Sequence, residues 1–215
     1  IEPLELGTLV WVDGRVTHIN FYNQNGGNGI GIAGEIPSGL WDMTSLINIT
    51  IGNNWNAGSN QIIGEISPEI SNLINLEKFS SHDTELTGII PEEICTLENL
   101  TKIWLENNPL SGTIPDCIGN LTNLTMLDLG GGLFTGEIPH SIGNLVNLSW
   151  LYLSCSSSNL TGEIPSEIGN LTNISSLIIS APQLTGEIPS QIGNLTNVGW
   201  LSLSGDLTGE IPSEI

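Results

Sequence analysis

The sequence predicts an α/β solenoid: a right-handed superhelix of stacked turns, with a parallel β-sheet on its concave face and short helical or 3-10 turns on its convex face. Two periodic features predict this fold. Between recurring glycines, the spacing of apolar residues shortens from three to two, which marks a helical turn that runs into a strand. The glycines belong to a Gly-x-Ile-Pro-like unit that recurs eight times at intervals of 23 to 30 residues, at Gly34, Gly64, Gly88, Gly112, Gly136, Gly162, Gly186 and Gly209.

The stretch from Ile142 to Leu153 shows the change of spacing most clearly, with apolar residues at Ile142, Leu145, Leu148, Leu151 and Leu153. In the strand, a period of two points Leu151 and Leu153 into the core and Trp150 and Tyr152 outward. Each turn places its strand beside the strand of the preceding turn. The strands therefore pair in parallel, and residues at equivalent positions form columns along the stack.

One column consists of asparagines that come just before the strands. A side-chain amide has two donors and an acceptor, so these asparagines can hydrogen-bond from turn to turn and satisfy buried backbone groups. We interpret the column as structural. Its members are Asn75, Asn99, Asn123, Asn147, Asn173 and Asn197.

The composition excludes several classes of function. The chain carries 23 Asp and Glu against 3 Lys and Arg, a net charge of −20, which repels a nucleic-acid backbone or an anionic membrane. We therefore expect no nucleic-acid partner. No stretch of the sequence is apolar for the roughly 18 residues that a membrane span requires, so we expect no membrane insertion in this segment.

The sequence offers no residues for catalysis. The three histidines, His18, His82 and His140, fall at unrelated positions of the repeat. We find no nucleophile beside a base, no carboxylate pair in a cleft and no Cys or His spacing typical of a metal site. We expect no enzyme, no cofactor, and no catalytic or metal-binding residues.

Residues 160–180, LTGEIPSEIGNLTNISSLIIS, resemble the plant-specific class of leucine-rich repeat. This class occurs in receptor-kinase ectodomains and polygalacturonase-inhibiting proteins, and similar repeats occur in secreted microbial proteins. The resemblance implies a module that binds a protein, peptide or glycan on its concave strand face, at an extracellular or cell-surface location. It does not identify the ligand, because one fold carries many functions.

The resemblance also divides the chain. Residues 16–215 form a leucine-rich-repeat solenoid of eight turns that ends in mid-repeat at Ile215. Residues 1–15 are interpreted as the remnant of an amino-terminal cap, because VWVDGRVTHINF at 10–21 resembles the end of such a cap. The paired cysteines of a typical cap are absent. An uncapped last turn exposes an apolar cross-section, which favours either further protein beyond residue 215 or a partner that covers it.

The outward strand positions form the candidate binding surface. Neighbouring parallel strands lie about 4.8 Å apart, so Trp104, Met126, Trp150 and Tyr152 are expected to make one contiguous aromatic patch, a composition typical of binding hot spots. The alternative is that the rings lie flat over their own sheet without a partner. The candidate ligand-binding residues are Lys78, Lys102, Trp104, Met126, Asp128, Trp150, Tyr152 and Trp200.

Three further features lie off this surface. Two enlarged loops follow the first two strands, and Trp55 is the exposed aromatic candidate of this rim. Cys95 and Cys117 fall in adjacent turns near one aligned isoleucine, so the spacing is equally compatible with a disulfide and with two free thiols, whereas Cys155 is interpreted as free. Asn159 is the best glycosylation acceptor among the Asn-x-Ser/Thr sequons.

Three functions remain open at this point. The first is extracellular recognition or adhesion through the concave face. The alternative is a structural repeat block of a larger surface protein or filament, which implies end-to-end self-association. The third is ice binding by a hydroxyl column next to the glutamates of the Gly-Glu-Ile-Pro units, made of Thr87, Ser111, Thr135, Thr161, Thr185 and Thr208.

Overall fold

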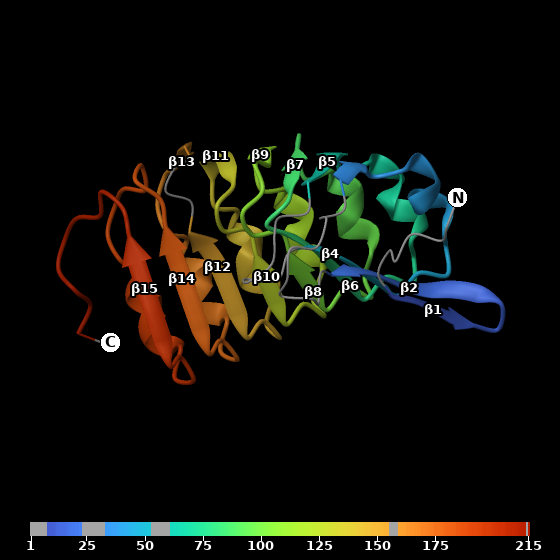
Figure 1. The fold of residues 1–215 in the computed structure, drawn as a ribbon. Coiled ribbons are helices and arrows are strands. Elements are labelled where there is room, and N and C mark those ends of the chain that lie inside the picture. The colour runs from blue at the N-terminus through green and yellow to red at the C-terminus, as the bar shows by residue number, and fades with distance from the viewer. Residues whose placement is uncertain (1–7, 23–32, 53–60, 155–158, 214) are drawn as a thin grey trace.

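A nine-stranded sheet runs the length of the computed structural model, which describes residues 8–22, 33–52, 61–154, 159–213 and 215 (Figure 1). Successive strands of the stack are neighbours and pair in parallel, apart from the first pair. The solenoid fold predicted from the repeat is therefore confirmed. The order of the sheet is β1 (Thr8–Val12), β2 (Arg15–Tyr22), β4 (Asn48–Gly52), β6 (Lys78–His82), β8 (Lys102–Trp104), β10 (Met126–Asp128), β12 (Trp150–Ser154), β14 (Ser176–Ser180) and β15 (Trp200–Ser204).

The amino-terminal strand differs from the rest of the sheet. β1 pairs antiparallel with β2, and the chain reverses through Asp13 at φ 50° and Gly14 at φ 76°. An Asp-Gly pair with two positive φ values is the turn that best matches the twist of a hairpin. β2 begins at Arg15 and pairs with β4 on its other side, so the hairpin joins the last residues of the predicted cap remnant to the first turn of the solenoid.

A second row of short parallel strands, which the sequence analysis did not predict, runs along one edge of the stack (Figure 1). It consists of two three-stranded sheets formed where the chain leaves the main sheet and passes through the Gly-x-Ile-Pro region. One contains β3 (Ala33–Glu35), β5 (Gln61–Glu65) and β7 (Glu85–Thr87), and the other contains β9 (Ser111–Gly112), β11 (Leu133–Glu137) and β13 (Asn159–Thr161).

Seven five-residue 3-10 helices of the described part of the chain lie on the side opposite the main sheet. In six of them the residue before the helix is a proline held near φ −65° in extended backbone, and in the second it is Ser67. Proline fixes φ and cannot donate a hydrogen bond, so it ends the preceding strand and starts the turn. The helices are η1 (Ser38–Asp42), η2 (Pro68–Asn72), η3 (Glu92–Thr96), η4 (Asp116–Asn120), η5 (His140–Asn144), η6 (Ser166–Asn170) and η7 (Ser190–Asn194).

Columns of leucine and isoleucine fill the space between the helices and the sheet. In the turn that contains β12, the exposed fraction of Ile142, Leu145, Leu148, Leu151 and Leu153 is 0%. Along β12 the side chains alternate between exposed or half-buried and buried. The alternation of inward and outward side chains predicted for this strand is therefore confirmed.

The asparagine column joins successive turns as interpreted from the sequence. Each of the six side-chain amides donates a hydrogen bond of 2.7–2.9 Å to a backbone carbonyl of the preceding turn. Asn123 Nδ2, for example, donates to the carbonyl of Glu98. Because carbonyl groups outside the sheet ladder need a donor, the column holds the stack together at the point where each strand begins.

The recurring glycines meet two requirements at once. Gly162 has φ +77°, a region that other residues rarely adopt. In addition, Glu137 of the preceding turn lies across it, with Cγ only 2.9 Å from where a Cβ of residue 162 would stand. Glu163 covers Gly186 in the same way. The glycine thus permits the bend and makes room for the glutamate.

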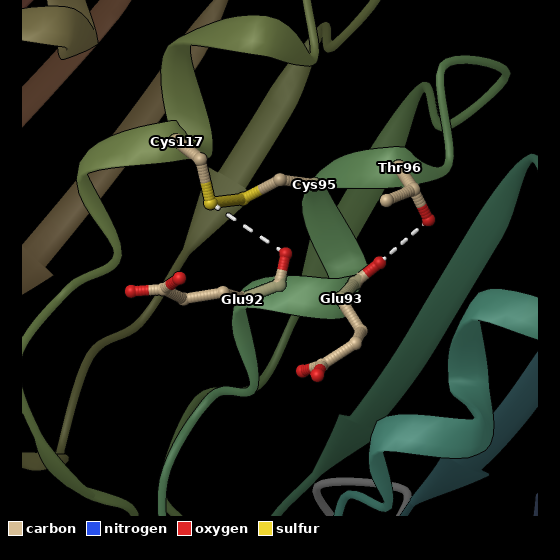
Figure 2. The surroundings of a disulfide bond; sticks show 5 residues. All are labelled: Glu92, Glu93, Cys95, Thr96 and Cys117. Carbon is tan, nitrogen blue, oxygen red and sulfur yellow. Dashed lines mark hydrogen bonds between the residues drawn. A yellow bond between two sulfur atoms is a disulfide. The ribbon is translucent and has the colours of Figure 1, made fainter.

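A disulfide joins η3 to η4 on the helical side of the solenoid (Figure 2). Cys95 and Cys117 have Cα atoms 5.8 Å apart and a sequence separation of 22 residues. Cys95 is buried and packs with the hydrophobic core, and Cys117 is half-buried. The bond is therefore a covalent link between two adjacent turns. Cys155 lies outside the described residues.

We predict that the Cys95→Ser, Cys117→Ser double variant loses about 3 kcal/mol of unfolding free energy, because closing a loop of this length restricts the unfolded chain by that amount. Urea unfolding of the oxidised protein and the variant measures the difference. Wild-type protein treated with dithiothreitol is the matched control and should unfold like the variant. Identical midpoints with and without reductant would contradict the prediction.

Candidate binding site on the open face of the sheet

Side chains that point away from the core cover the solvent side of the main sheet, which we call the open face. In-register pairing arranges them in two rows across the strands. The first row is Lys78, Lys102, Met126, Trp150, Ser176 and Trp200. The second row is Ser80, Trp104, Asp128, Tyr152, Ile178 and Ser202. All eight candidate binding residues therefore belong to these two rows.

The candidate residues differ in exposure. Trp150 and Trp200 are 46% and 64% exposed, and Lys78 is exposed. Lys102, Trp104, Met126 and Tyr152 are half-buried. Asp128 is 3% exposed, which corrects the expectation that it presents its carboxylate at the surface. Two of the three tryptophans are thus available to a partner without rearrangement.

The strand register places a carboxylate among the residues of the expected aromatic patch. In the second row Asp128 stands between Trp104 and Tyr152, and in the first row Met126 stands between Lys102 and Trp150. Trp200 is separated from Trp150 by Ser176. Three residues of the expected patch, Trp104, Met126 and Tyr152, line one hollow together with this carboxylate.

The hollow has a volume of about 430 Å³, and we call it the Asp128 hollow. It brings together four of the eight candidate residues and leaves Lys78, Lys102, Trp150 and Trp200 outside its lining. Its size falls within the range of ligand pockets. The lining residues are Trp104, Glu106, Asn107, Met126, Asp128, Gly130, Gly131, Tyr152, Ser154 and Ile178.

Trp104 is fixed by its neighbours on the sheet. Its ring stacks on the imidazole of His82, with centroids 3.9 Å apart and planes 3° from parallel. Lys102 Nζ lies 4.4 Å from the ring centroid, and the indole Nε1 donates a 3.1 Å hydrogen bond to Glu106 Oε2. The alternative interpretation, in which the rings lie flat over their own sheet, therefore fits Trp104, which stacks on His82. It does not fit Trp150 and Trp200, which are exposed.

His82 and Glu106 are contributors that the sequence analysis did not select. β6 is five residues long, so its period of two gives a third outward position, at His82, after Lys78 and Ser80. Glu106 stands in the corresponding place after β8. Counting three outward positions per turn instead of two is the signal that identifies them.

Asp128 is the electrostatic centre of the hollow. Its Oδ1 accepts a 3.0 Å hydrogen bond from the backbone N–H of Gly130. The pKa of its carboxyl is raised to about 7, chiefly by burial; Glu106 and Asp83 also act to raise it, while the Gly130 hydrogen bond and Lys102 act to lower it. Trp104 and Tyr152 of the adjacent turns flank the group, and the tight turn at Gly130 follows it in the chain.

Lys102 is a cation whose charge acts on Asp128. Burial lowers the pKa of its ammonium group; the charge of Lys78 lowers it further, and Asp128 acts in the opposite direction. The ammonium group lies over the Trp104 ring. Among the described residues, the one ion pair within 4.0 Å is His140 with Glu167, on the helical side. Lys102 therefore does not form a close pair with Asp128.

The remaining sequence candidates lie elsewhere. Trp55 falls outside the described residues, as does most of each enlarged loop. Asn159 is exposed, and its Oδ1 accepts a hydrogen bond of 2.8 Å from Gln183 Nε2, so its glycosylation stays a prediction. Within the described ranges, no group of three or more His, Cys, Asp and Glu side chains is arranged to hold a metal ion.

The hydroxyl column makes backbone hydrogen bonds. Five of its six members each donate to the carbonyl of the glycine one turn earlier, as Thr185 Oγ1 does to Gly162 at 3.3 Å. These hydroxyl donors are used within the protein, which weighs against an ice-binding array. The glutamates beside them line a larger groove of about 1340 Å³ along the same edge, and each carboxylate there is on an exposed residue.

The repeats match a family described as Leucine Rich Repeat over residues 99–121, 123–145 and 147–171. The chain is a leucine-rich-repeat protein. None of the helices described for this leucine-rich-repeat chain has the length and apolar character to cross a membrane. No curated protein sequence matches it.

Solved structures with this fold include plant receptors. The ectodomain of the Arabidopsis thaliana receptor kinase GASSHO1/SCHENGEN3, in complex with CASPARIAN STRIP INTEGRITY FACTOR 2, is 36% identical, with a TM-score of 0.78 over 86% of this chain and 21% of that chain. The Arabidopsis receptor kinase HAESA, in complex with the peptide hormone IDA and the co-receptor SERK1, is 34% identical, with a TM-score of 0.78 over 86% of this chain and 30% of that chain. The leucine-rich-repeat chain thus spans about a fifth to a third of these receptor chains.

The same fold also occurs in proteins of other kinds. A plant ice-binding protein is 22% identical, with a TM-score of 0.64 over 97% of this chain and 79% of that chain. An internalin from Listeria monocytogenes is 20% identical, with a TM-score of 0.63 over 91% of this chain and 49% of that chain. At this identity the two structures are similar to the leucine-rich-repeat chain in fold alone.

We predict that Asp128→Asn stabilises the protein above pH 7 by up to about 4 kcal/mol. The folded pKa of about 7 exceeds the ordinary value of 3.8, and each unit corresponds to about 1.4 kcal/mol. Below about pH 4 the carboxyl is protonated in both states and its ionisation has no cost. As the pH rises from about 4 to 7, the unfolded state ionises first and wild-type stability falls relative to the variant.

Urea unfolding at several pH values measures this difference between the wild type and Asp128→Asn. Asp116→Asn, which removes one carboxylate from an exposed position on η4, controls for the change in net charge. A stability difference that stays constant from pH 4 to pH 8 would show that the buried carboxyl does not titrate as stated.

Proposed function

We propose that this chain is an extracellular recognition module that binds a peptide or an extended protein segment on the open face of its sheet. The observation that carries the proposal is the combination of exposed aromatic rings and a hollow on one face. Trp150 is 46% exposed beside the hollow that Trp104 and Tyr152 line. Large aromatic residues next to a pocket are typical of the centre of a protein interface.

The geometry of the sheet favours recognition through side chains. Parallel pairing on both sides of β6 through β14 uses the backbone groups of these strands within the sheet. A ligand that crosses the open face therefore meets rows of side chains spaced by about 4.8 Å, the distance between neighbouring strands. An extended peptide repeats its side chains on one side about every 6 to 7 Å, so it can contact several turns in succession.

The comparisons support a peptide over a glycan. The two receptor structures described above, each more than 30% identical to this chain, were both solved with a named peptide hormone or factor. The Cys95–Cys117 disulfide supports an extracellular location, because disulfides persist in oxidising compartments. Glycan binding, a structural repeat block and ice binding remain the competing functions, and the experiment below distinguishes the first of these.

The test is selection of peptides from a displayed random library on the immobilised chain, followed by calorimetry with the selected synthetic peptides. We predict that the Trp150→Ala, Tyr152→Ala variant loses at least about 30-fold in affinity, the equivalent of one hot spot of about 2 kcal/mol. Ile74→Ala, Val146→Ala is the matched control, since both residues are exposed and apolar but lie outside the sheet.

Selected peptides that bind the aromatic double variant as tightly as the wild type would remove the open face as the binding surface. A glycan array tested in parallel completes the design. Binding of glycans with no selected peptide would replace the peptide by a sugar as the ligand. Circular dichroism of each variant establishes that it is folded before its affinity is compared.

A further inference from the structure

We infer that the Asp128 hollow is a subsite for an arginine side chain of the bound peptide, with the guanidinium group against the carboxylates of Asp128 and Glu106. This inference rests on the proposed function and makes it more specific. The inference names a chemical group for the hollow, which four of the eight candidate residues line.

The position of the carboxylate inside the hollow is the first argument. The register places Asp128 between Trp104 and Tyr152, and all three side chains line the same cavity. Asp128 Oδ1 accepts one hydrogen bond, from Gly130 N. A carboxylate oxygen has two lone pairs and the group has two oxygens, so Asp128 has capacity for a further donor from the hollow.

The balance of charge is the second argument. Glu106 and Asp83 are close enough to raise the pKa of Asp128, so the local field is negative. The nearby cation, Lys102, lies over the Trp104 ring and forms no ion pair with Asp128 within 4.0 Å among the described residues. A cation brought by a ligand therefore meets a buried negative charge that the protein itself compensates poorly, and a close charge pair of this kind can add to the affinity.

The shape of the lining favours a guanidinium group over an ammonium group. A guanidinium is planar, binds carboxylates through paired N–H donors and stacks on aromatic rings, and it is more weakly hydrated than an ammonium. The hollow offers two carboxylates and the ring of Tyr152, whereas His82 and Lys102 already lie against the ring of Trp104. Glu106 is held by Trp104 Nε1 through Oε2, which fixes the second acceptor in place.

The larger groove along the glutamate edge lacks this combination. Its acidic residues are Glu137, Glu163, Glu187 and Glu210, and all four are exposed to solvent. Solvent-exposed carboxylates interact weakly with a cation, because water screens the charge. It lacks both a buried carboxylate and an aromatic wall, whereas the Asp128 hollow combines the two.

The test uses N-acetyl-arginine amide as the probe and N-acetyl-citrulline amide as its uncharged isostere. We expect the arginine probe to shift the NMR signal of the Trp104 indole N–H and to lower the pH midpoint of the Asp128 carboxyl carbon, because a bound cation favours the ionised form. The citrulline probe should do neither. Asp128→Asn should remove the indole response, and Asp116→Asn should keep it.

The selected peptides give the second readout. We expect them to be enriched in arginine, and Asp128→Asn to weaken an arginine-containing peptide at least tenfold while leaving its arginine-to-citrulline form unchanged. An equal response to citrulline, or displacement of the arginine probe by millimolar calcium or lysine amide, would overturn the arginine assignment.

The outcomes separate the two proposals. Peptides that need Trp150 and Tyr152 but not Asp128 would leave the recognition function in place and overturn the arginine subsite. Failure to select any peptide would contradict the recognition function, whereas the amide probe tests the subsite by itself. Because Asp128→Asn is expected to be more stable than the wild type above pH 7, loss of binding by this variant cannot be attributed to unfolding.

Discussion

The in-register pairing of each strand with its neighbours one turn away is the constraint on which the rest of the structure depends. It aligns Met126 with Trp150 and Leu127 with Leu151, so apolar residues meet in the core and variable residues meet on the open face. The asparagine amides reinforce this alignment from outside the sheet. A slip of one residue would exchange the two sides, which explains why length variation between turns is confined to segments outside the main strands.

This constraint also determines where function can reside. Few substitutions fit at the buried core positions or at the recurring glycines. Gly162 and Gly186, for example, have positive φ values, and a glutamate of the preceding turn lies across each of them. Outward strand positions have no such restriction, and there the chain differs from turn to turn: Lys102 and Trp104 in one strand, Met126 and Asp128 in the next. Recognition residues are therefore expected at the variable positions of the open face and not at the positions that are the same in every turn.

The fold could be predicted from the sequence because it depends on periodicity, which is a local property of each turn. The second row of strands could not, because a segment such as Ser111–Gly112 is too short to show an alternating pattern. The candidate site was predicted only in part. The period of two places Asp128 on the outward side, but its burial results from side chains of the adjacent turns and from the turn at Gly130. Likewise, the stacking of Trp104 on His82 joins two turns.

The buried carboxylate illustrates how a repeat protein can combine rigidity with specificity. In most of this acidic chain the carboxylates lie on exposed residues, where water screens them. Asp128 is the buried acid among the described residues: it is 3% exposed, and its ionisation opposes folding. This unfavourable free energy of ionisation mainly affects the adjacent turns, because each turn of a solenoid is stabilised chiefly by its nearest neighbours. The surrounding turns, covalently linked on the helical side at Cys95 and Cys117, can therefore hold a charge in a cavity that a ligand of opposite charge would neutralise.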